Sequence, residues 1–446
     1  MGREVCVLMV NPWIYDFACY DLFSKPIGFL KIARLLSNLG FKIRFIDCLD
    51  RFHPQMINRI TDKGICGIGK YYAEEVEKPS IFKDIPRKYK RYGMPPIIFK
   101  KLLKKFKKPD IILVTSGMTY WYKGVFEVLE ILKKNYPKVP IILGGIYATL
   151  CYHHALEYSR ADFVFKGGDL KELLILLGKI LSKDFTYDIN SIYLPPYYEI
   201  YSKNEYIALR TSSGCPFKCS YCGWYLLEPK IYQHNPEDIF SEIVYFHQKL
   251  KIKNFAFYDD ALLYKADTHI KIILKKILEY QLPLNFHTPN GLNACFLDEE
   301  LAHLMKKTNF LQPRLGLESV SFNRQRLTGG KVNKKTIIEA VKLLKKAGYS
   351  SSDIGIYLLI GLPGQPFEEI EESIYFAHSF KARVYLEEYS PVPGTYEYNR
   401  AKLDTNLDPL WHNNSVFPLY KGEYNKFQML KELNHKLNRK FCRKEV

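Results

Sequence analysis

The sequence lacks the features that define several protein classes. None of its apolar runs reaches the ~18 residues that a transmembrane helix needs. The N-terminal segment has no recognisable signal-peptide cleavage site, so we expect a cytoplasmic protein without a membrane span. No internal repeat at a solenoid period is visible. Hydrophobic residues make up 47% and charged residues 25% of the chain. These ordinary values exclude a disordered chain, a collagen-like fibre and a small disulfide-stapled scaffold.

Acidic residues are too few to balance the basic ones. The chain has 47 Asp and Glu against 65 Lys and Arg, which gives a net charge of +18. The excess is greatest between Lys83 and Lys108, where eleven basic residues accompany the single Asp84. Such a stretch binds nucleic acid or acidic lipid, or forms one solvated face of a helix. Aromatic residues are not interleaved with it as a stacking platform requires, so we favour the solvated face and expect no nucleic-acid partner.

The length of 446 residues predicts two or three domains. Over residues 1–185, apolar strand-like runs alternate with amphipathic helical patterns, and the first helical pattern stops at Gly40. This alternation predicts a doubly wound, Rossmann-like α/β domain with a parallel sheet, whose ligands bind beyond the carboxyl ends of the strands. The expected strands are residues 5–10, 41–48, 64–69, 110–117, 140–145 and 161–168.

Residues 186–205 are rich in Tyr, Pro and Asn without a helical period, and we interpret them as a linker. A second α/β series follows over residues 206–400, with six strand patterns each followed by a helix or a loop. Six such units predict a partial (β/α)6 barrel. We expect residues 401–446 to be a short helical extension, with its helix after Gly422.

Three of the ten cysteines, Cys215, Cys219 and Cys222, lie within eight residues directly after the first strand pattern of the second series. In a reducing compartment, clustered cysteines indicate metal ligands before disulfides. Three thiolates in a tight loop can hold three irons of a 4Fe–4S cluster and leave the fourth iron open. The competing interpretation is a zinc site, which needs a fourth ligand such as His234. The other seven cysteines are isolated, and we expect them to be small core residues.

The run TSSGCPFKCSYCGW and the motifs after it resemble the radical SAM superfamily. The resemblance covers about residues 206–400 and rests on motifs that follow the strand patterns in the family's order. These motifs are the CxxxCxxC loop, YDD at 258–260, NGL at 290–292, GLES at 316–319, GLPGQ at 361–365 and PVPGT at 391–395.

The resemblance implies a chemistry and a set of binding residues. Cys215, Cys219 and Cys222 would ligate three irons, and the open iron would chelate S-adenosylmethionine (SAM). Reductive cleavage of SAM would yield a 5′-deoxyadenosyl radical, which abstracts hydrogen from a substrate. Asp, Ser and Gly at these strand ends could instead cap helices or form turns. The implied SAM contacts are Tyr221 against adenine, Asp259 and Asp260 near the amine, Glu318 and Ser319 near the ribose, and Asn290, Gly361 and Gly364 at the remaining motifs.

Residues 1–185 resemble the cobalamin-binding domain that precedes many radical SAM barrels. The matching segments are VTSG at 114–117, LGGIYATL at 143–150 and ADFVFKGGDLKELL at 161–174. The resemblance implies that Thr115, Ser116, Gly144 and Gly145 approach the nucleotide tail of cobalamin, although they could also be ordinary turns. The sequence departs from the family in one respect: the segment NPWIYDFACYDLFSKPIG after the first strand lacks the DxHxxG histidine that ligates cobalt. Cobalamin is therefore a candidate cofactor here and not a required one.

We predict a radical SAM enzyme with a 4Fe–4S cluster and SAM, associated with cobalamin and acting as a methyltransferase on an unactivated carbon. The main alternative is a cobalamin-independent radical SAM oxidoreductase. Two further alternatives are a tRNA-modifying methylthiotransferase, which would need a second cysteine cluster and a C-terminal β-barrel, and a non-catalytic metal-binding protein. The expected partners are a small-molecule substrate and a reducing electron donor such as ferredoxin or flavodoxin. The sequence names neither the substrate nor a catalytic residue.

Overall fold

The computed structural model describes residues 4–60, 62, 64–185, 193–403, 408–420 and 422–441. The chain divides into two compact units, which are described separately. Unit 1 comprises residues 1–205 with 408–411, and unit 2 comprises residues 206–407 with 412–446. The predicted linker over 186–205 lies partly outside the described residues, as do parts of the predicted extension over 401–446. No helix in the described part of the chain is long and apolar enough to cross a membrane.

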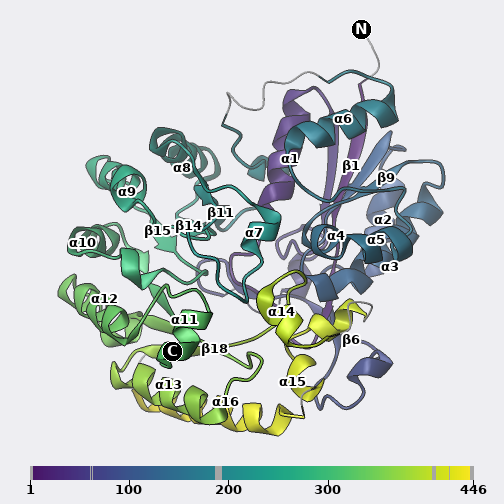
Figure 1. Ribbon diagram of the computed structural model, residues 1–446. Helices are drawn as coiled ribbons and strands as arrows, with labels where there is room; N and C mark the ends of the chain where they lie inside the picture. Colours follow the sequence, from purple (N-terminus) through teal and green to yellow (C-terminus); the bar gives the residue numbers. More distant parts are fainter. Residues whose placement is uncertain are drawn as a thin grey trace. The chain divides into compact units, whose positions relative to one another are not determined.

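Unit 1 is built on a five-stranded parallel sheet with the order β10-β9-β8-β1-β4 (Figure 1). The central strands β1 and β8 are almost wholly buried, as expected for a parallel sheet covered on both faces. The predicted α/β fold class is confirmed. The strands are β1 (Cys6–Asn11), β4 (Lys42–Asp47), β8 (Ile111–Val114), β9 (Ile141–Leu143) and β10 (Phe163–Val164).

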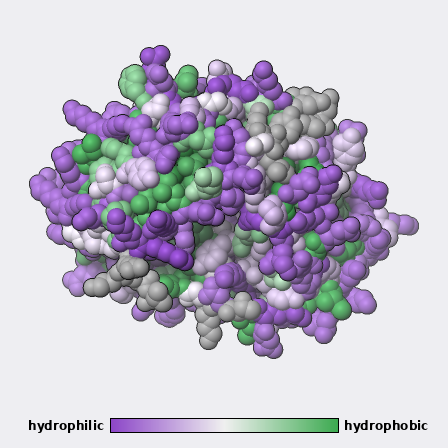
Figure 2. All heavy atoms as spheres, turned by 90° about the horizontal axis from the view of Figure 1, so that it is seen from below, coloured by the Kyte–Doolittle hydropathy of each residue, from purple (hydrophilic) through white to green (hydrophobic). Residues whose placement is uncertain are grey.

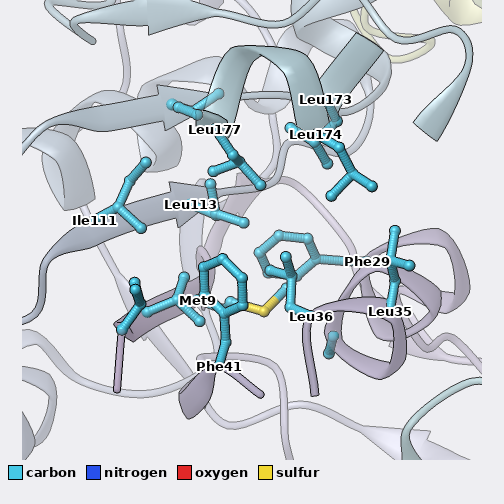
Figure 3. Packing of buried hydrophobic residues seen from close by; sticks show 14 of the residues in the cluster. Met9, Phe29, Leu35, Leu36, Phe41, Ile111, Leu113, Leu173, Leu174 and Leu177 are labelled. Atoms are coloured by element: carbon cyan, nitrogen blue, oxygen red, sulfur yellow. The ribbon is translucent and has the colours of Figure 1, made fainter. Parts of the chain in front are cut away.

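Helices connect these strands and bury their apolar sides against the sheet. Figure 3 shows one side of this core, where Met9 and Leu113 from the sheet meet Phe29 and Leu36 of α1 and Leu174 of α6. Burial of such side chains is the main favourable term in folding. The helices are α1 (Ile27–Asn38), α3 (Tyr122–Asn135), α4 (Ile146–Leu150), α5 (Tyr152–Tyr158) and α6 (Leu170–Leu181).

The expectation of a strand over residues 64–69 is wrong. Gly64, Cys66 and Gly67 all have positive φ angles, at 56°, 57° and 85°, which no extended strand has. Only β5 (Gly69–Lys70) forms nearby, and it pairs antiparallel with β3 (Tyr20–Asp21) outside the parallel sheet. The apolar residues of this run therefore form a turn and not a strand.

The basic segment is a helix with one solvated face, preceded by a strand. In α2 (Pro96–Lys105), Phe99, Leu102 and Leu103 are buried, while the lysines between and after them are exposed. Hydrophilic side chains likewise predominate on the face drawn in Figure 2, where hydrophobic side chains gather mainly in one area at left of centre. The preceding strand, β7 (Lys90–Tyr92), lies antiparallel between β2 (Ile14–Asp16) and β6 (Ala73–Glu75).

Unit 2 is a partial barrel of parallel strands with helices on its outside (Figure 1). A parallel bridge between Leu292 and Leu315 joins its two sheets. The fourth strand is bent, because the short β16 (Phe310–Leu311) is separated from the next strand by Gln312, whose φ is 51°. The strands of the series are β11 (Ile207–Leu209), β14 (Asn254–Phe257), β15 (Asn285–His287), β17 (Arg314–Glu318), β18 (Gly355–Ile360) and β19 (Arg383–Glu388).

The outer helices of unit 2 begin with polar caps that the sequence supplies. Asn235, Asp298 and Asn333 each accept a backbone N–H at the start of α8, α10 and α12, which satisfies one of the unpaired donors of a helix N-terminus. The helices are α8 (Pro236–Leu250), α9 (Ile270–Glu279), α10 (Glu299–Lys307), α12 (Lys334–Lys346), α13 (Phe367–Ser379) and α16 (Tyr424–Phe441). Shorter elements are β12 (Ser212–Ser213), β13 (Tyr232–Gln233), α7 (Trp224–Leu227), α11 (Phe322–Leu327), α14 (Tyr396–Arg400) and α15 (Phe417–Tyr420).

Candidate active site

The cysteine loop of unit 2 runs from β12 to α7 and is held at both ends. Gly214 opens it with a φ of 79°, and its N–H donates to the Asp260 carboxylate at 3.0 Å. A β-carbon at position 214 would lie 2.9 Å from the carbonyl oxygen of Lys230, so glycine is required here. At the other end, the Trp224 indole donates to the carbonyl of Phe217 at 2.9 Å. The loop is therefore fixed before any ligand binds.

The loop places Cys215 and Cys219 in buried positions and leaves Cys222 partly exposed. Two residues that the sequence analysis missed lie against these thiols. The amide of Asn293 lies 4.0 Å from the Sγ of Cys215. A β-carbon at Gly329 would lie 3.0 Å from the Sγ of Cys219. Glycine at 329 thus leaves room directly beside a thiol. The sequence does not show this role, because the loop after β17 meets the cysteine loop only in the folded structure.

The three thiols fit a cluster better than a single metal ion. Each thiol lies within electrostatic range of another, but no three His, Cys, Asp or Glu side chains of the described residues converge as ligands of one ion. A 4Fe–4S cluster does not need such convergence, because each cysteine binds a different iron. The donor set therefore favours the cluster over the zinc site considered from the sequence.

A buried ion pair lies beside the loop. Lys331 donates to Glu318 at 2.7 Å, with 16% and 14% of the two side chains exposed. Burial opposes the charge on Lys331, but Glu318, Tyr221 and Cys219 outweigh it and hold the pKa of the ammonium well above its ordinary value. Burial raises the pKa of the Cys219 thiol to about 11, and Lys331 acts against that rise. A fixed positive charge beside the thiols stabilises their anionic, metal-binding form.

The pair occupies the place where strand β17 ends irregularly. Glu318 has a φ of 65°, which is rare for a residue other than glycine or asparagine, and the pairing with β18 shifts register just before it. A β-carbon at Gly316 would lie 3.1 Å from the Glu318 carboxylate. Lys331 also lies 5.9 Å from the centre of the Tyr221 ring. The expected site residues Tyr221 and Glu318 are therefore adjacent, and Lys331, which the sequence did not single out, connects them.

The two carboxylates of the YDD motif differ in their surroundings. Asp259 is buried, and its Oδ1 accepts from Thr211 at 2.8 Å and Ser212 at 2.5 Å, while its Oδ2 has no hydrogen-bond partner. Burial raises the pKa of Asp259. A buried carboxylate oxygen without a partner is costly and fits a ligand that brings a donor. Asp260 instead binds the Gly214 N–H and Arg210, at 3.0 and 3.2 Å, so it holds the loop.

Ser319 is hydrogen-bonded to neighbouring residues of the protein. Its hydroxyl is buried and donates to Glu369 at 2.7 Å, and its carbonyl accepts from Gln325 at 2.6 Å. Arg324 in turn lies 3.3 Å from Glu369. The hydroxyl is thus already paired within the protein, and contact of Ser319 with SAM stays a prediction.

The remaining expected SAM residues lie at neighbouring strand ends. Asn290 donates to the main-chain carbonyl of Asp259 at 3.3 Å. Gly361 has a φ of 86°, and its N–H donates to Gln365 at 2.9 Å. Gly364 has a φ of 70°, and its carbonyl accepts from Arg324 at 2.7 Å. The two glycines are required by this turn, and their contact with adenine stays a prediction.

In unit 1, the loops after β8 and β9 are packed on each other. The Ser116 hydroxyl donates to the carbonyl of Gly144 at 2.6 Å and accepts the Ala148 N–H at 3.3 Å. Gly145 has a φ of 95°, and a β-carbon there would lie 2.3 Å from the Ser116 carbonyl oxygen. Ser116 and Gly145 therefore build the loops.

Thr115 and Gly144 remain available to a ligand. Thr115 is partly exposed, and within the described residues its hydroxyl makes no hydrogen bond. A β-carbon at Gly144 would meet nothing closer than 3.9 Å. These features fit a group held through backbone and small side chains, without a histidine from the loop after β1.

A partial βα barrel with three thiols beyond its first strand defines a class of enzyme that holds an iron–sulfur cluster at the carboxyl ends of its strands. Residues 209–377 match the family described as the radical SAM superfamily. This part of the chain is thus a radical SAM domain, and the enzyme class predicted from the sequence is confirmed.

Comparison with other proteins extends the likeness beyond the barrel. An uncharacterized methyltransferase of Pyrococcus horikoshii is 26% identical over 335 residues, which is 67% of this chain and 71% of the relative. The structure of TsrM, a radical S-adenosylmethionine methyltransferase from Kitasatospora setae, matches with a TM-score of 0.64 and 14% identity over 88% of this chain and 75% of TsrM. OxsB, a cobalamin-dependent S-adenosylmethionine radical enzyme, matches with a TM-score of 0.57 and 14% identity over 97% of this chain and 62% of OxsB. The fold of both units is thus shared with these enzymes.

Proposed function

We propose that the protein is a cobalamin-associated radical SAM methyltransferase acting on a small-molecule substrate. The observation that carries the proposal is the fixed loop of Cys215, Cys219 and Cys222 beside the unpaired carboxylate oxygen of Asp259. When bound, the cluster and SAM supply reductive cleavage of SAM to a 5′-deoxyadenosyl radical. The methyltransferase assignment draws on the relative and the two structural neighbours, whose descriptions name methyl transfer or cobalamin.

The chain's own residues would hold the reactants in place. The three thiolates would ligate the cluster, and Asn293 and Gly329 would shape the space around two of them. Asp259 Oδ2 would accept from the SAM amine, which satisfies a buried oxygen that lacks a donor. Lys331 would hold Glu318 in place through the 2.7 Å ion pair, so that the carboxylate can accept from the ribose hydroxyls.

Unit 1 would hold cobalamin through few polar contacts. The Thr115 hydroxyl and the backbone at Gly144 are the groups that a nucleotide tail could approach. The loop between β1 and α1 contains no histidine, so it would supply no imidazole ligand to cobalamin. An electron donor such as ferredoxin or flavodoxin would reduce the cluster, and a reducing, cytoplasmic location would suit the thiols.

Anaerobic reconstitution tests the proposal. The protein is incubated with iron, sulfide and hydroxocobalamin, desalted, and analysed for iron, sulfide and its visible spectrum. We expect about four irons per chain, retained corrinoid bands, and formation of 5′-deoxyadenosine when SAM and a reductant are added. A cluster without corrinoid would replace methyl transfer with a cobalamin-independent radical SAM oxidoreductase.

Cysteine variants locate the cluster. Cys219→Ala should lose the cluster and all SAM cleavage, because one of three iron ligands is removed. Cys66→Ala, in a turn of unit 1, is the matched control and should keep both. SAM cleavage by Cys219→Ala at the wild-type rate would contradict the ligand assignment.

A further inference from the structure

The strands β17, β18 and β19 present two different faces. Leu315, Leu317, Ile356 and Leu358 are fully buried, and Val384 is 1% exposed; these side chains lie on the face that α13 and α16 cover. Arg314, Tyr357 and Tyr385 alternate with them along the strands and point to the other, inner face of the barrel. These three side chains are partly exposed. This part of the inner face is therefore polar and accessible to water, unlike the packed interior of a closed barrel.

Arg314 is the central charged group of this inner face. Its guanidinium lies 4.7 Å from the ring centre of Tyr385 and 5.7 Å from that of Tyr357, and it donates to the Tyr357 hydroxyl at 2.6 Å. Tyr357 in turn donates to the carbonyl of Pro289 at 2.9 Å. No carboxylate among the described residues lies within 4.0 Å of Arg314, so the guanidinium keeps most of its donors free.

Gly355 keeps Arg314 in this position. It lies opposite Arg314 in the register of β17 and β18. A β-carbon at Gly355 would lie 2.9 Å from the Cγ of Arg314 and 3.0 Å from the Tyr385 ring. A glycine in a strand interior is unfavourable unless another group must approach the backbone closely. Here that group is the arginine stem, which crosses β18 to reach Tyr385.

Glu387 lies on the same inner face as Arg314. Solvent reaches its side chain, and it stands two residues after Tyr385 in β19, against whose ring the Arg314 guanidinium lies. Desolvation raises the pKa of Glu387, and Arg314 acts against that rise. Arg314 and Glu387 are therefore neighbouring charged groups of this face.

We propose that Arg314 binds a carboxylate of the substrate on this inner face. This proposal rests on the proposed function in one respect, namely that the reaction takes place inside the barrel. It narrows the substrates to small molecules that carry a carboxylate. The planar guanidinium matches a carboxylate through two parallel hydrogen bonds, and the two tyrosine rings hold it in one orientation. A doubly charged phosphate fits less well, because the carboxyl group of Glu387 lies on the same face.

Site-specific labelling of arginine tests this proposal on the reconstituted wild-type enzyme. Phenylglyoxal modifies accessible arginines, and peptide mass spectrometry reports the extent of labelling at Arg314 and at Arg326. Arg326 is an exposed residue of α11 and serves as the internal control. We expect 3-phenylpropionate and acetate to protect Arg314 and not Arg326. The neutral isostere 3-phenylpropanol should protect neither, and phenyl phosphate should protect Arg314 less than 3-phenylpropionate does.

Equal labelling of Arg314 with and without the carboxylates would overturn the proposal, as would failure of Arg314 to react while Arg326 does. Stronger protection by phenyl phosphate would overturn the choice of a carboxylate. A second measurement uses Arg314→Lys, which keeps the charge but loses the planar fork, with Arg326→Lys as the control. Saturation-transfer NMR should show about tenfold weaker binding of 3-phenylpropionate to Arg314→Lys, the loss expected for one good charged hydrogen bond.

The outcomes separate this proposal from the proposed function. SAM cleavage by the wild-type enzyme without carboxylate protection would leave the radical SAM assignment intact and remove the carboxylate site. Carboxylate protection without cluster loading or SAM cleavage would remove the proposed function and leave the anion site.

Discussion

The two units differ in how the polar groups at the ends of their parallel strands are paired. In unit 1, the loops after β8 and β9 hydrogen-bond to each other, since the Ser116 hydroxyl bonds to the Gly144 carbonyl and to the Ala148 N–H. In unit 2, the carboxylate of buried Asp259 has an oxygen without a hydrogen-bond partner, and Glu318 has a left-handed φ. The same ends of the strands carry the three thiols. Unpaired and strained groups cost stability and persist where a ligand or a reaction uses them. The comparison supports the proposal that the chemistry takes place in unit 2, whereas the proposed role of unit 1 is binding.

The largest expected effect concerns the space beside Cys219. Gly329→Ala would place a β-carbon 3.0 Å from the Sγ and 3.1 Å from the Cα of Cys219, which would displace one of the three proposed cluster ligands. A displacement of about 1 Å in a reacting group can lower a rate about 100-fold, and we expect SAM cleavage to fall by that order. Iron content and 5′-deoxyadenosine formation measure the effect.

Gly330→Ala is the matched control for this variant. Gly330 also has a positive φ, at 66°, but a β-carbon there would meet nothing within 4 Å. It therefore carries the backbone strain without the contact to the thiol, and SAM cleavage should stay close to wild type. If both variants lose the cluster equally, glycine is needed at 329 and 330 because of the backbone angles and not because of the space beside Cys219.

The second prediction compares a buried and an exposed ion pair of unit 2. Glu318→Gln leaves the buried ammonium of Lys331 without its carboxylate and should lower the free energy of unfolding by about 3 kcal/mol. Glu372→Gln removes the 2.8 Å pair with Lys334, whose side chains are 61% and 48% exposed, and should cost less than about 1 kcal/mol. Denaturant unfolding of both variants measures the difference. Equal costs would show that the pair beside the cysteine loop is no more than a surface contact.

The sequence predicted the positions of the strands well because each motif follows an apolar run that the sheet buries. The cysteine loop was located from its spacing after a strand pattern, whereas Asp259 and Glu318 were expected from the resemblance to the radical SAM superfamily. Lys331 was missed because it belongs to the loop after α11 and reaches Glu318 only in the fold. Arg314 was missed because a lone arginine at a strand start carries no motif, and only the register with Gly355 shows its position.

One error has a local physical cause. The run 64–69 was predicted as a strand from its apolar residues, but its positive φ angles make it a turn. There the backbone angles, which the hydrophobic pattern does not report, decide the structure.

The third prediction tests the division of roles within unit 1. Gly145→Ala would bring a β-carbon to 2.3 Å from the Ser116 carbonyl oxygen at a φ of 95°, and should cost about 2 kcal/mol of stability through strain. Gly144→Ala adds a methyl group to a side that is open to 3.9 Å, so the free energy of unfolding should hardly change. Because Gly144 is the available approach to the loop, this variant should instead retain less corrinoid after desalting. Loss of stability in Gly144→Ala with unchanged corrinoid would reverse the two roles, and would place the corrinoid contact at another strand end of unit 1.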